Sequence, residues 1–265
     1  MQKKETILDE FFKSENIIYI EKDSRGQILE TNNEEVIPIY SQIINSSIRD
    51  KNRYYHKPSK TWYKLIKRVV NGIDVEYLVD ITEFQKELYY LKRDSLTGLI
   101  KDRNEASKLM EDYIDYAILE NQSFSLLAAD VDNFKEINDN FGHNCGDLVL
   151  KLISKIILSS TKQSDDIFDT RSSDIILRFG GDEFLILLKN VTLEETKQKM
   201  EEISSKISNS CFSYEGKNVS VSISIGYSHF LDNEDKSKNS TEIRKVLSKK
   251  ADNCLYQRKR NRTSN

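Results

Sequence analysis

Residues 175–188 read IILRFGGDEFLILL, and this stretch decides how the second half of the chain folds. Two apolar runs flank a Gly-Gly-Asp-Glu tip, which is the pattern of two strands joined in a hairpin. Because a tight hairpin turn needs positive φ, which glycine adopts without strain, we expect Gly180 and Gly181 to form the turn. A turn alone does not explain why two acids, Asp182 and Glu183, stand at the tip of a buried hairpin.

A second apolar run also ends in acids. Residues 126–132 read LLAADVD, which places Asp130 at the end of a buried strand. A buried carboxylate is unfavourable unless it is paired or binds a cation. The alternative is an exposed loop acid that caps the next helix, and it suits Asp132 better than Asp130.

Brought together, Asp130, Asp182 and Glu183 would offer the hard oxygen atoms that Mg²⁺ prefers alongside water and substrate phosphates. Two such ions can activate a hydroxyl group and neutralise a leaving phosphate in an in-line displacement. The sequence contains no G-x-x-x-x-G-K-[ST] loop, so we expect the phosphates to be held without a P-loop.

The rest of the second half alternates helical and extended patterns, which is typical of an α/β sheet layered with helices. Helices are expected over 102–120, 147–160, 194–209 and 241–260, and strands over 124–129, 175–179, 184–188 and 219–227.

The first 82 residues indicate a small antiparallel sheet with little helix. Pro38 limits any helix around it to about one turn. From Ile81 to Leu91 apolar residues recur with a 3-4-3 spacing, which predicts an amphipathic helix. Its stripe packs either on its own domain or against a second copy of the chain. Strands are expected over 17–20, 27–29, 62–70 and 75–79, with an Asn71-Gly72 hairpin between the last two.

Composition excludes several classes of protein. Of 265 residues only nine are glycine and two proline, which excludes collagen-like and Gly/Pro-rich chains. With 38% apolar residues and a net charge of −3, we expect neither wholesale disorder nor general nucleic-acid binding. Three widely spaced cysteines, no export signal and no apolar run of 18 residues favour a cytoplasmic protein without a membrane span. Residues 244–265 hold eight basic residues and one acid, either a solvated helix face or a local phosphate site.

The stretch RFGGDEF at 178–184 resembles the signature of the GGDEF family, the diguanylate cyclases. Companion blocks follow in the family's order: DSLTGL at 94–99, DVDNFKEIND at 130–139, FGHNCGD at 141–147, SISIG at 222–226 and ADNCLY at 251–256. The resemblance implies a palm-like fold, with a central, mostly antiparallel sheet flanked by helices. It also implies condensation of two GTP into cyclic di-GMP and two pyrophosphates.

The resemblance assigns roles by position. Asp130 and Asp182 would bind Mg²⁺ or Mn²⁺ with the Val131 carbonyl assisting, and Glu183 would add charge there or accept the 3′-hydroxyl proton. The Asp147 carboxylate can accept hydrogen bonds from the N1–H and the amino group of guanine, and adenine has no such pair of donors. The other role expected for Asp147 is that of a helix N-cap. The remaining substrate contacts would come from Phe134 and Lys135 at the triphosphate, Asn138 at the guanine, Gly180 and Gly181 at the hairpin, and Lys259 and Arg262 at the phosphates.

The end of the chain departs from the family's pattern. The family's closing glycine is missing here, so either Arg262 takes the role of the family's arginine one residue early, or Thr263 stands at that position without a gap.

Most glycines fall inside the family's blocks, and we expect them to mark places where a nucleotide comes close.

Residues Arg171 and Asp174 match the R-x-x-D of the family's inhibitory product site, to which Arg178 would contribute. The resemblance therefore implies feedback inhibition by cyclic di-GMP, which couples two distinct sites.

The N-terminal segment resembles a PAS sensor domain, through its opening hairpin at 18–32 and the sequence VDITE at 79–83. The expected domains are a PAS-like sensor over 1–82, a signalling helix over 83–93 and the cyclase over 94–265. No cofactor is predicted for the sensor; His56, its only histidine, is either a loop residue or a haem ligand.

One such cyclase domain would hold one GTP, so the reaction requires two subunits facing each other about a two-fold axis. Two rival functions are a non-catalytic receptor for cyclic di-GMP or GTP, and a cyclase making a mixed cyclic GMP-AMP. The presence of Asp182 and Glu183 favours the enzyme over the receptor, and Asp147 favours GTP as the substrate.

Overall fold

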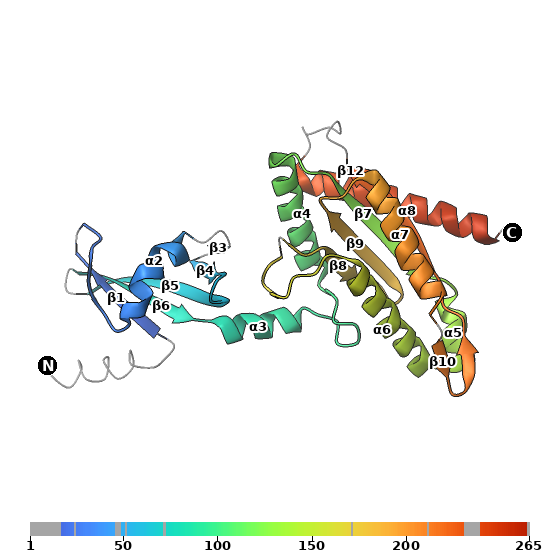
Figure 1. Ribbon diagram of the computed structural model, residues 1–265, viewed down its shortest axis with the longest axis horizontal. Helices are drawn as coiled ribbons and strands as arrows, with labels where there is room; N and C mark the ends of the chain where they lie inside the picture. Colours follow the sequence, from blue (N-terminus) through green and yellow to red (C-terminus); the bar gives the residue numbers. More distant parts are fainter. Residues whose placement is uncertain are drawn as a thin grey trace. The chain divides into compact units, whose positions relative to one another are not determined.

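A computed structural model describes residues 17–23, 25–45, 49–50, 52–70, 73–170, 172–210, 212–230 and 239–263. The chain divides into two compact units, Met1–Leu91 and Lys92–Asn265, each with its own sheet and core (Figure 1).

The first unit is built on a six-stranded antiparallel sheet, as the sequence predicted. Its strands lie in the order β2-β1-β6-β5-β4-β3, so that β1 pairs along its length with β6. Ile20, Leu78 and Ile43 are fully buried between the sheet and helix α2 (Ile37–Ile44). The strands are β1 (Ile17–Lys22), β2 (Ile28–Thr31), β3 (Arg49–Asp50), β4 (Arg53–His56), β5 (Thr61–Val70) and β6 (Ile73–Asp80).

Helix α2 is longer than the single turn expected around Pro38. Pro38 lies in the first turn of its eight residues, where the backbone N–H that proline lacks has no partner within the helix. The prediction from Pro38 was therefore wrong. A short 3₁₀ helix, η1 (Glu34–Val36), precedes α2, and the Asn33 side chain accepts a 3.0 Å hydrogen bond from the Glu35 amide. The Asn71-Gly72 tip lies outside the described residues.

His56 ends β4 and is 5% exposed, so it is not a loop residue. Its Nδ1 lies 2.8 Å from Ser59 Oγ, and its Nε2 lies 3.5 Å from Gln42 Oε1. Both ring nitrogens therefore face polar groups of the same unit.

A buried carboxylate joins three parts of the first unit. Glu76 on β6 is 5% exposed and pairs with Lys22 (2.8 Å), with Lys67 (2.6 Å) and with the Tyr40 hydroxyl of α2. Burial alone would raise the pKa of Glu76, but hydrogen bonds from Lys22, Lys67 and Tyr40 outweigh it and lower this pKa to about 2.

The Glu76 cluster predicts an acid-sensitive first unit. Because the folded pKa of about 2 lies below the ordinary 4.5, the stabilisation is complete above pH 4.5 and is lost as the pH falls toward 2. Its full size is on the order of 3 kcal/mol. The chain's one tryptophan, Trp62, lies in this unit, so urea unfolding followed by tryptophan fluorescence at pH 7 and pH 3 measures the loss. Glu76→Gln should flatten this pH dependence, whereas Glu30→Gln, exposed on β2, should not; equal pH profiles for wild type and Glu76→Gln would contradict the assignment.

The second unit has a four-stranded sheet in the order β12-β7-β9-β8, with every neighbouring pair antiparallel. The expected fold class, a central antiparallel sheet flanked by helices, is thus confirmed. The strands are β7 (Phe124–Val131), β8 (Ile175–Arg178), β9 (Glu183–Lys189) and β12 (Ile223–Phe230), with a separate ribbon of β10 (Phe212–Tyr214) and β11 (Lys217–Val219). The helices are α4 (Arg103–Leu119), α5 (Phe134–Phe141), α6 (His143–Ser160), α7 (Leu193–Ser208) and α8 (Ser240–Thr263).

Helices cover both faces of this sheet (Figure 1), because β7 is apolar on both sides. Leu126 packs into the core beneath α4 and α8, whereas its neighbour Leu127 packs into the core beneath α6 and α7. On the α4 and α8 side, Phe124 stacks on Phe230 with ring centroids 4.8 Å apart.

Helix α5 was not among the expected elements, and the starts of α6 and β12 differ most from those expected. Helix α6 begins at His143 rather than at 147, because the chain turns at Gly142 directly from α5 into α6. Residues 217–219 pair with β10 through a turn at Glu215 and Gly216, both at positive φ, so β12 begins only at 223. Among the helices of the described ranges, none is long and apolar enough to cross a membrane.

Candidate functional site

The predicted acids meet at one end of the four-stranded sheet. Asp130, near the end of β7, lies directly opposite Glu183, the first residue of β9. The next residue along β7, Val131, donates its backbone N–H to the carbonyl of Asp182 at 3.2 Å. Because side chains of directly opposed residues project from the same face of a sheet, Asp130 and Glu183 share the face that carries α8.

Asp130 interacts with several charged side chains, which together set its pKa. Burial raises the pKa of Asp130, and the neighbouring charges of Asp182 and Asp132 raise it further. The Lys259 ammonium, which hydrogen-bonds to Asp130 Oδ1, lowers this pKa, but the net shift is upward. Lys259, which was predicted to bind the phosphates, thus contacts the Asp130 carboxylate. It lies in the last turns of α8.

The acids suit a hard divalent cation in chemistry, although their side chains do not form a closed cage. Within the described ranges, no group of three or more His, Cys, Asp or Glu side chains is arranged around a common metal position. Mg²⁺ usually takes only one or two carboxylates and completes its shell with water and phosphate oxygens. The mutual repulsion of Asp130 and Asp182 is the kind that a cation between them would relieve.

The hairpin tip is shaped differently from the turn expected. Gly180 and Gly181 lie in the turn between β8 and β9, as expected, but neither lies at positive φ, so the expected backbone conformation was wrong. A side chain at Gly180 would instead bring a Cβ within 2.7 Å of Glu183 Oε2, whereas the space around Gly181 is open. The amide of Phe179 bonds to the Glu183 carbonyl at 2.8 Å and closes the hairpin. Gly180 therefore makes room for the Glu183 carboxylate.

An ion pair fixes this hairpin to the start of the second unit. The Arg178 guanidinium donates to the Gly181 carbonyl at 2.7 Å and to Asp94 Oδ1 at 2.9 Å. Burial opposes ionisation of Asp94, but hydrogen bonds from Thr97 and Arg178 outweigh it and lower the pKa of this carboxyl. Sequence reasoning gave Asp94 no role; the signal was its place in the DSLTGL block.

A second group of predicted residues gathers where α5 meets α6. Gly146 faces Asn138 so closely that a Cβ there would overlap its amide, with Asn138 Cγ at 3.0 Å and Phe134 Cζ at 3.2 Å. Asp147 follows Gly146 and is exposed, as is Lys135 on α5. The N-cap of α6 is Gly142, so the expected capping role of Asp147 was wrong. Sequence reasoning did not predict the contact of Gly146.

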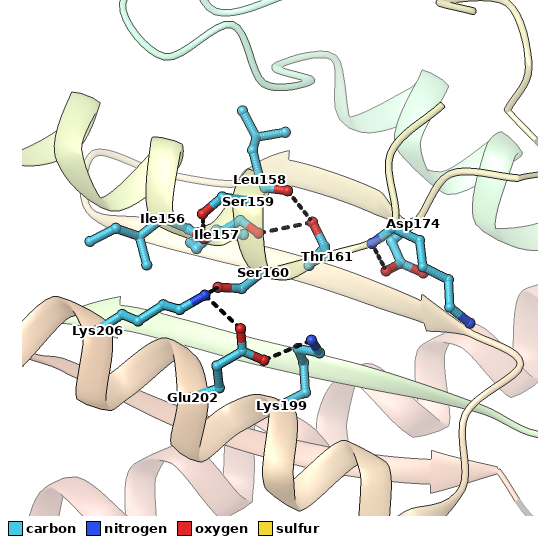
Figure 2. A network of polar contacts seen from close by, with 11 residues as sticks. Ile156, Ile157, Leu158, Ser159, Ser160, Thr161, Asp174, Lys199, Glu202 and Lys206 are labelled. Atoms are coloured by element: carbon cyan, nitrogen blue, oxygen red, sulfur yellow. Dashed lines mark hydrogen bonds and ion pairs between the residues drawn. The ribbon is translucent and has the colours of Figure 1, made fainter. Parts of the chain in front are cut away.

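Asp174, predicted in a product site, is engaged within the fold. It is 7% exposed, and its two carboxylate oxygens accept the backbone N–H groups of Lys162 and Lys189 at 2.8 and 2.9 Å. Figure 2 shows Asp174 with one of these two hydrogen bonds. Arg178 lies at the far end of β8 and binds elsewhere, so the structure does not bring it together with Asp174. Arg171 lies outside the described residues, as does the side chain of Arg262.

Comparison with known proteins identifies relatives of the second unit. The family model "Diguanylate cyclase, GGDEF domain" matches residues 91–265. Diguanylate cyclase A of Treponema denticola is 36% identical over 140 residues, which are 53% of this chain and 33% of that protein. This chain therefore spans about a third of that relative's length.

Two solved structures are similar to the chain. Diguanylate cyclase SiaD of Pseudomonas aeruginosa, solved with its activator SiaC, has a TM-score of 0.53 at 27% identity, over 68% of this chain and 64% of that one. The GGDEF domain of DgcB from Caulobacter crescentus, solved with c-di-GMP, has a TM-score of 0.54 at 21% identity, over 64% of this chain and 91% of that one. At 21% identity the second likeness concerns the fold alone.

Proposed function

The chain belongs to the GGDEF family of diguanylate cyclases, and on that premise we propose that it condenses two GTP into cyclic di-GMP and two pyrophosphates. The observation that carries the proposal is the meeting of Asp130 with the Asp182-Glu183 hairpin at one end of the sheet. These acids would hold the cation that such a phosphoryl transfer needs, and the identification of products separates an enzyme from a receptor.

The acids would hold the reacting groups. Asp130 and Asp182, with the Val131 carbonyl, would hold Mg²⁺ or Mn²⁺, which when bound would neutralise phosphate charge and favour ionisation of the 3′-hydroxyl. Glu183 adds a further negative charge at the same end of the sheet. Lys259 supplies a cation beside Asp130, within reach of the phosphates that would approach these acids.

The α5–α6 corner would bind the guanine. Asp147 is exposed and can accept from N1–H and the amino group, while the Asn138 amide beside Gly146 offers both a donor and an acceptor. ATP lacks those donors and would leave the Asp147 carboxylate desolvated without partners, which disfavours its binding. Phe134 packs into the core behind this corner and holds the start of α5.

Two copies would act together, because each copy would present one GTP and the product contains two. Helix α3 (Thr82–Leu91) supports this arrangement, since none of its residues is buried, and Phe84 and Leu91 are 55% and 69% exposed. Within the part of the first unit that the structure describes, Phe84 and Leu91 are therefore left largely uncovered. The rate per enzyme should fall on dilution, and a rate that stays constant far below the dimer dissociation constant would exclude a dimeric mechanism.

The first unit would act as a PAS-like sensor that sets the activity of the second, and the product would inhibit at a site that includes Arg171. Asp174 and Arg178, which the family resemblance also places there, make other contacts in this structure and lie apart. The antiparallel sheet of the first unit supports the sensor proposal. Inhibition by added cyclic di-GMP that is relieved in Arg171→Ala would support the product site; inhibition unchanged in that variant would argue against it.

The proposed activity is tested by incubating the full chain with GTP and Mg²⁺ and identifying products by mass spectrometry. We expect cyclic di-GMP and pyrophosphate, and neither with Asp182→Ala. Binding of GTP or cyclic di-GMP without turnover would instead identify a receptor, and a mixed product from GTP with ATP would identify the other rival enzyme.

Gly146 gives a specific test of guanine recognition. In Gly146→Ala the new methyl group would displace the Asn138 amide, and we expect the KM for GTP to rise about tenfold or more, the effect of roughly one lost hydrogen bond to a charged or polar group. Steady-state kinetics measures the change. Asn144→Ala, exposed in the first turn of α6, is the matched control; an unchanged KM in Gly146→Ala would place the guanine elsewhere.

A further inference from the structure

A pocket of about 430 Å³ opens in the second unit between α4, α8 and the sheet. Small side chains create it: Ala106 and Ser107 on α4, Ala128 on β7 and Ser248 on α8 all line the space. Larger residues at these positions would fill the gap between helices and sheet, as they do elsewhere in this core. The volume lies within the range of small-molecule sites.

The pocket combines an apolar floor with cations at its rim. Leu177 and Met110 contribute to the apolar lining. Lys245 and Lys249 stand one turn apart on α8, and both line the pocket. Neither makes an ion pair with another described residue, whereas Arg244 beside them already pairs with Glu111 at 2.8 Å.

The pocket also limits the charge of its ligand. Glu183 and Asp252 line it alongside the cations, so a polyanion such as a triphosphate would meet repulsion. A single negative charge near Lys245 and Lys249 would meet less repulsion than a triphosphate. The basic stretch after residue 244 thus contributes two lysines, which the proposed chemistry does not use, to a pocket that Glu183 also lines.

We infer that this pocket binds an organic monoanion, with an apolar body over the Ala128 and Leu177 floor and its acid group toward Lys245 and Lys249. A carboxylate or a phosphate ester would provide that acid group. The site is separate from the α5–α6 corner, and its binding does not depend on the proposed turnover.

Calorimetric titration of the full chain tests this site with three probes. 1-Naphthaleneacetate has the body and the charge, 1-naphthaleneacetamide has the body alone, and inorganic phosphate has charge alone. We expect the acetate to bind about tenfold more tightly than the amide, and phosphate not to compete with it. A phosphate that competes fully would reduce the site to adventitious anion binding and overturn the inference.

Variants locate the binding. Ser248→Leu should fill the pocket and weaken naphthaleneacetate binding at least tenfold. The exposed pair Lys245→Gln and Lys249→Gln, which leaves the core unchanged, should remove the preference for the acetate over the amide. Lys151→Gln, exposed on α6, should change neither. Acetate binding that survives both the Ser248 and the lysine substitutions, or no acetate binding at millimolar concentration, would refute the site, and neither result would bear on cyclic di-GMP synthesis.

Discussion

Replacing Asp130 with asparagine is expected to reduce cyclic di-GMP formation by about 1,000-fold or more. Asp130 lies opposite Glu183, and its carboxylate is repelled by that of Asp182. We therefore propose that the Asp130 charge holds a cation against the phosphates. Loss of such an electrostatic contact removes roughly 4 kcal/mol of transition-state stabilisation. The substitution also removes the ion pair between Asp130 and Lys259.

The measurement is the initial rate with GTP and Mg²⁺, together with the unfolding temperature of the second unit. Asp139→Asn, an exposed acid on α5, is the matched control and should keep its rate. Asp132→Asn is a second comparison, because its two oxygens accept from Ser222 and Ser224 at 2.7 and 2.6 Å; it should lower stability more than rate. An Asp130→Asn enzyme within tenfold of wild type would remove Asp130 from the mechanism.

Replacing Gly226 with alanine is expected to destabilise the second unit by about 3 kcal/mol. A Cβ at Gly226 on β12 would overlap the backbone nitrogen of Leu255 and the carbonyl oxygen of Ala251, and would lie 2.7 Å from the Leu255 Cα. These are backbone atoms of α8, which cannot rotate away as a side chain can. Either α8 moves off the sheet and takes Lys259 with it, or β12 distorts.

Thermal unfolding by circular dichroism measures the change, which should be about 10 °C for a unit of this size. Gly181→Ala is the matched control, because it adds the same methyl group in the same unit into open space. Tryptophan fluorescence, which reports Trp62 in the other unit, should not shift. Equal unfolding temperatures for Gly226→Ala and wild type would mean that α8 is not seated on β12 as described.

The sequence predicted most elements of the second unit because their patterns are local. The apolar runs that flank RFGGDEF require two strands, and the helical period over 103–119 requires a helix that begins after the Asp102 cap. Pro38 misled because proline breaks a helix interior but suits its first turn. The start of β12 was misplaced because residues 217–219 are as extended as a sheet strand, and only their pairing with β10 separates them from it.

The glycines show where local reasoning ends. Their scarcity and their places in the family's blocks led us to expect that they mark the approach of a nucleotide. Gly226 instead admits the backbone of α8, Gly146 admits the Asn138 amide, and Gly180 admits the Glu183 carboxylate. At each of these positions glycine is required because an atom from another part of the fold, or from across a turn, lies where a Cβ would be. Composition and spacing do not encode such contacts.

By itself the sequence determined the family, the order of strands and helices around the hairpin, and the acids Asp130, Asp182 and Glu183 that gather at its tip. Only the tertiary structure decided that Lys259 neutralises Asp130, that Asp94 holds Arg178, and that Ser107 and Ser248 leave a pocket between α4 and α8. The physical reason is range: hydrophobic period and turn chemistry act over a few residues, whereas ion pairs and packing gaps depend on which distant surfaces come into contact.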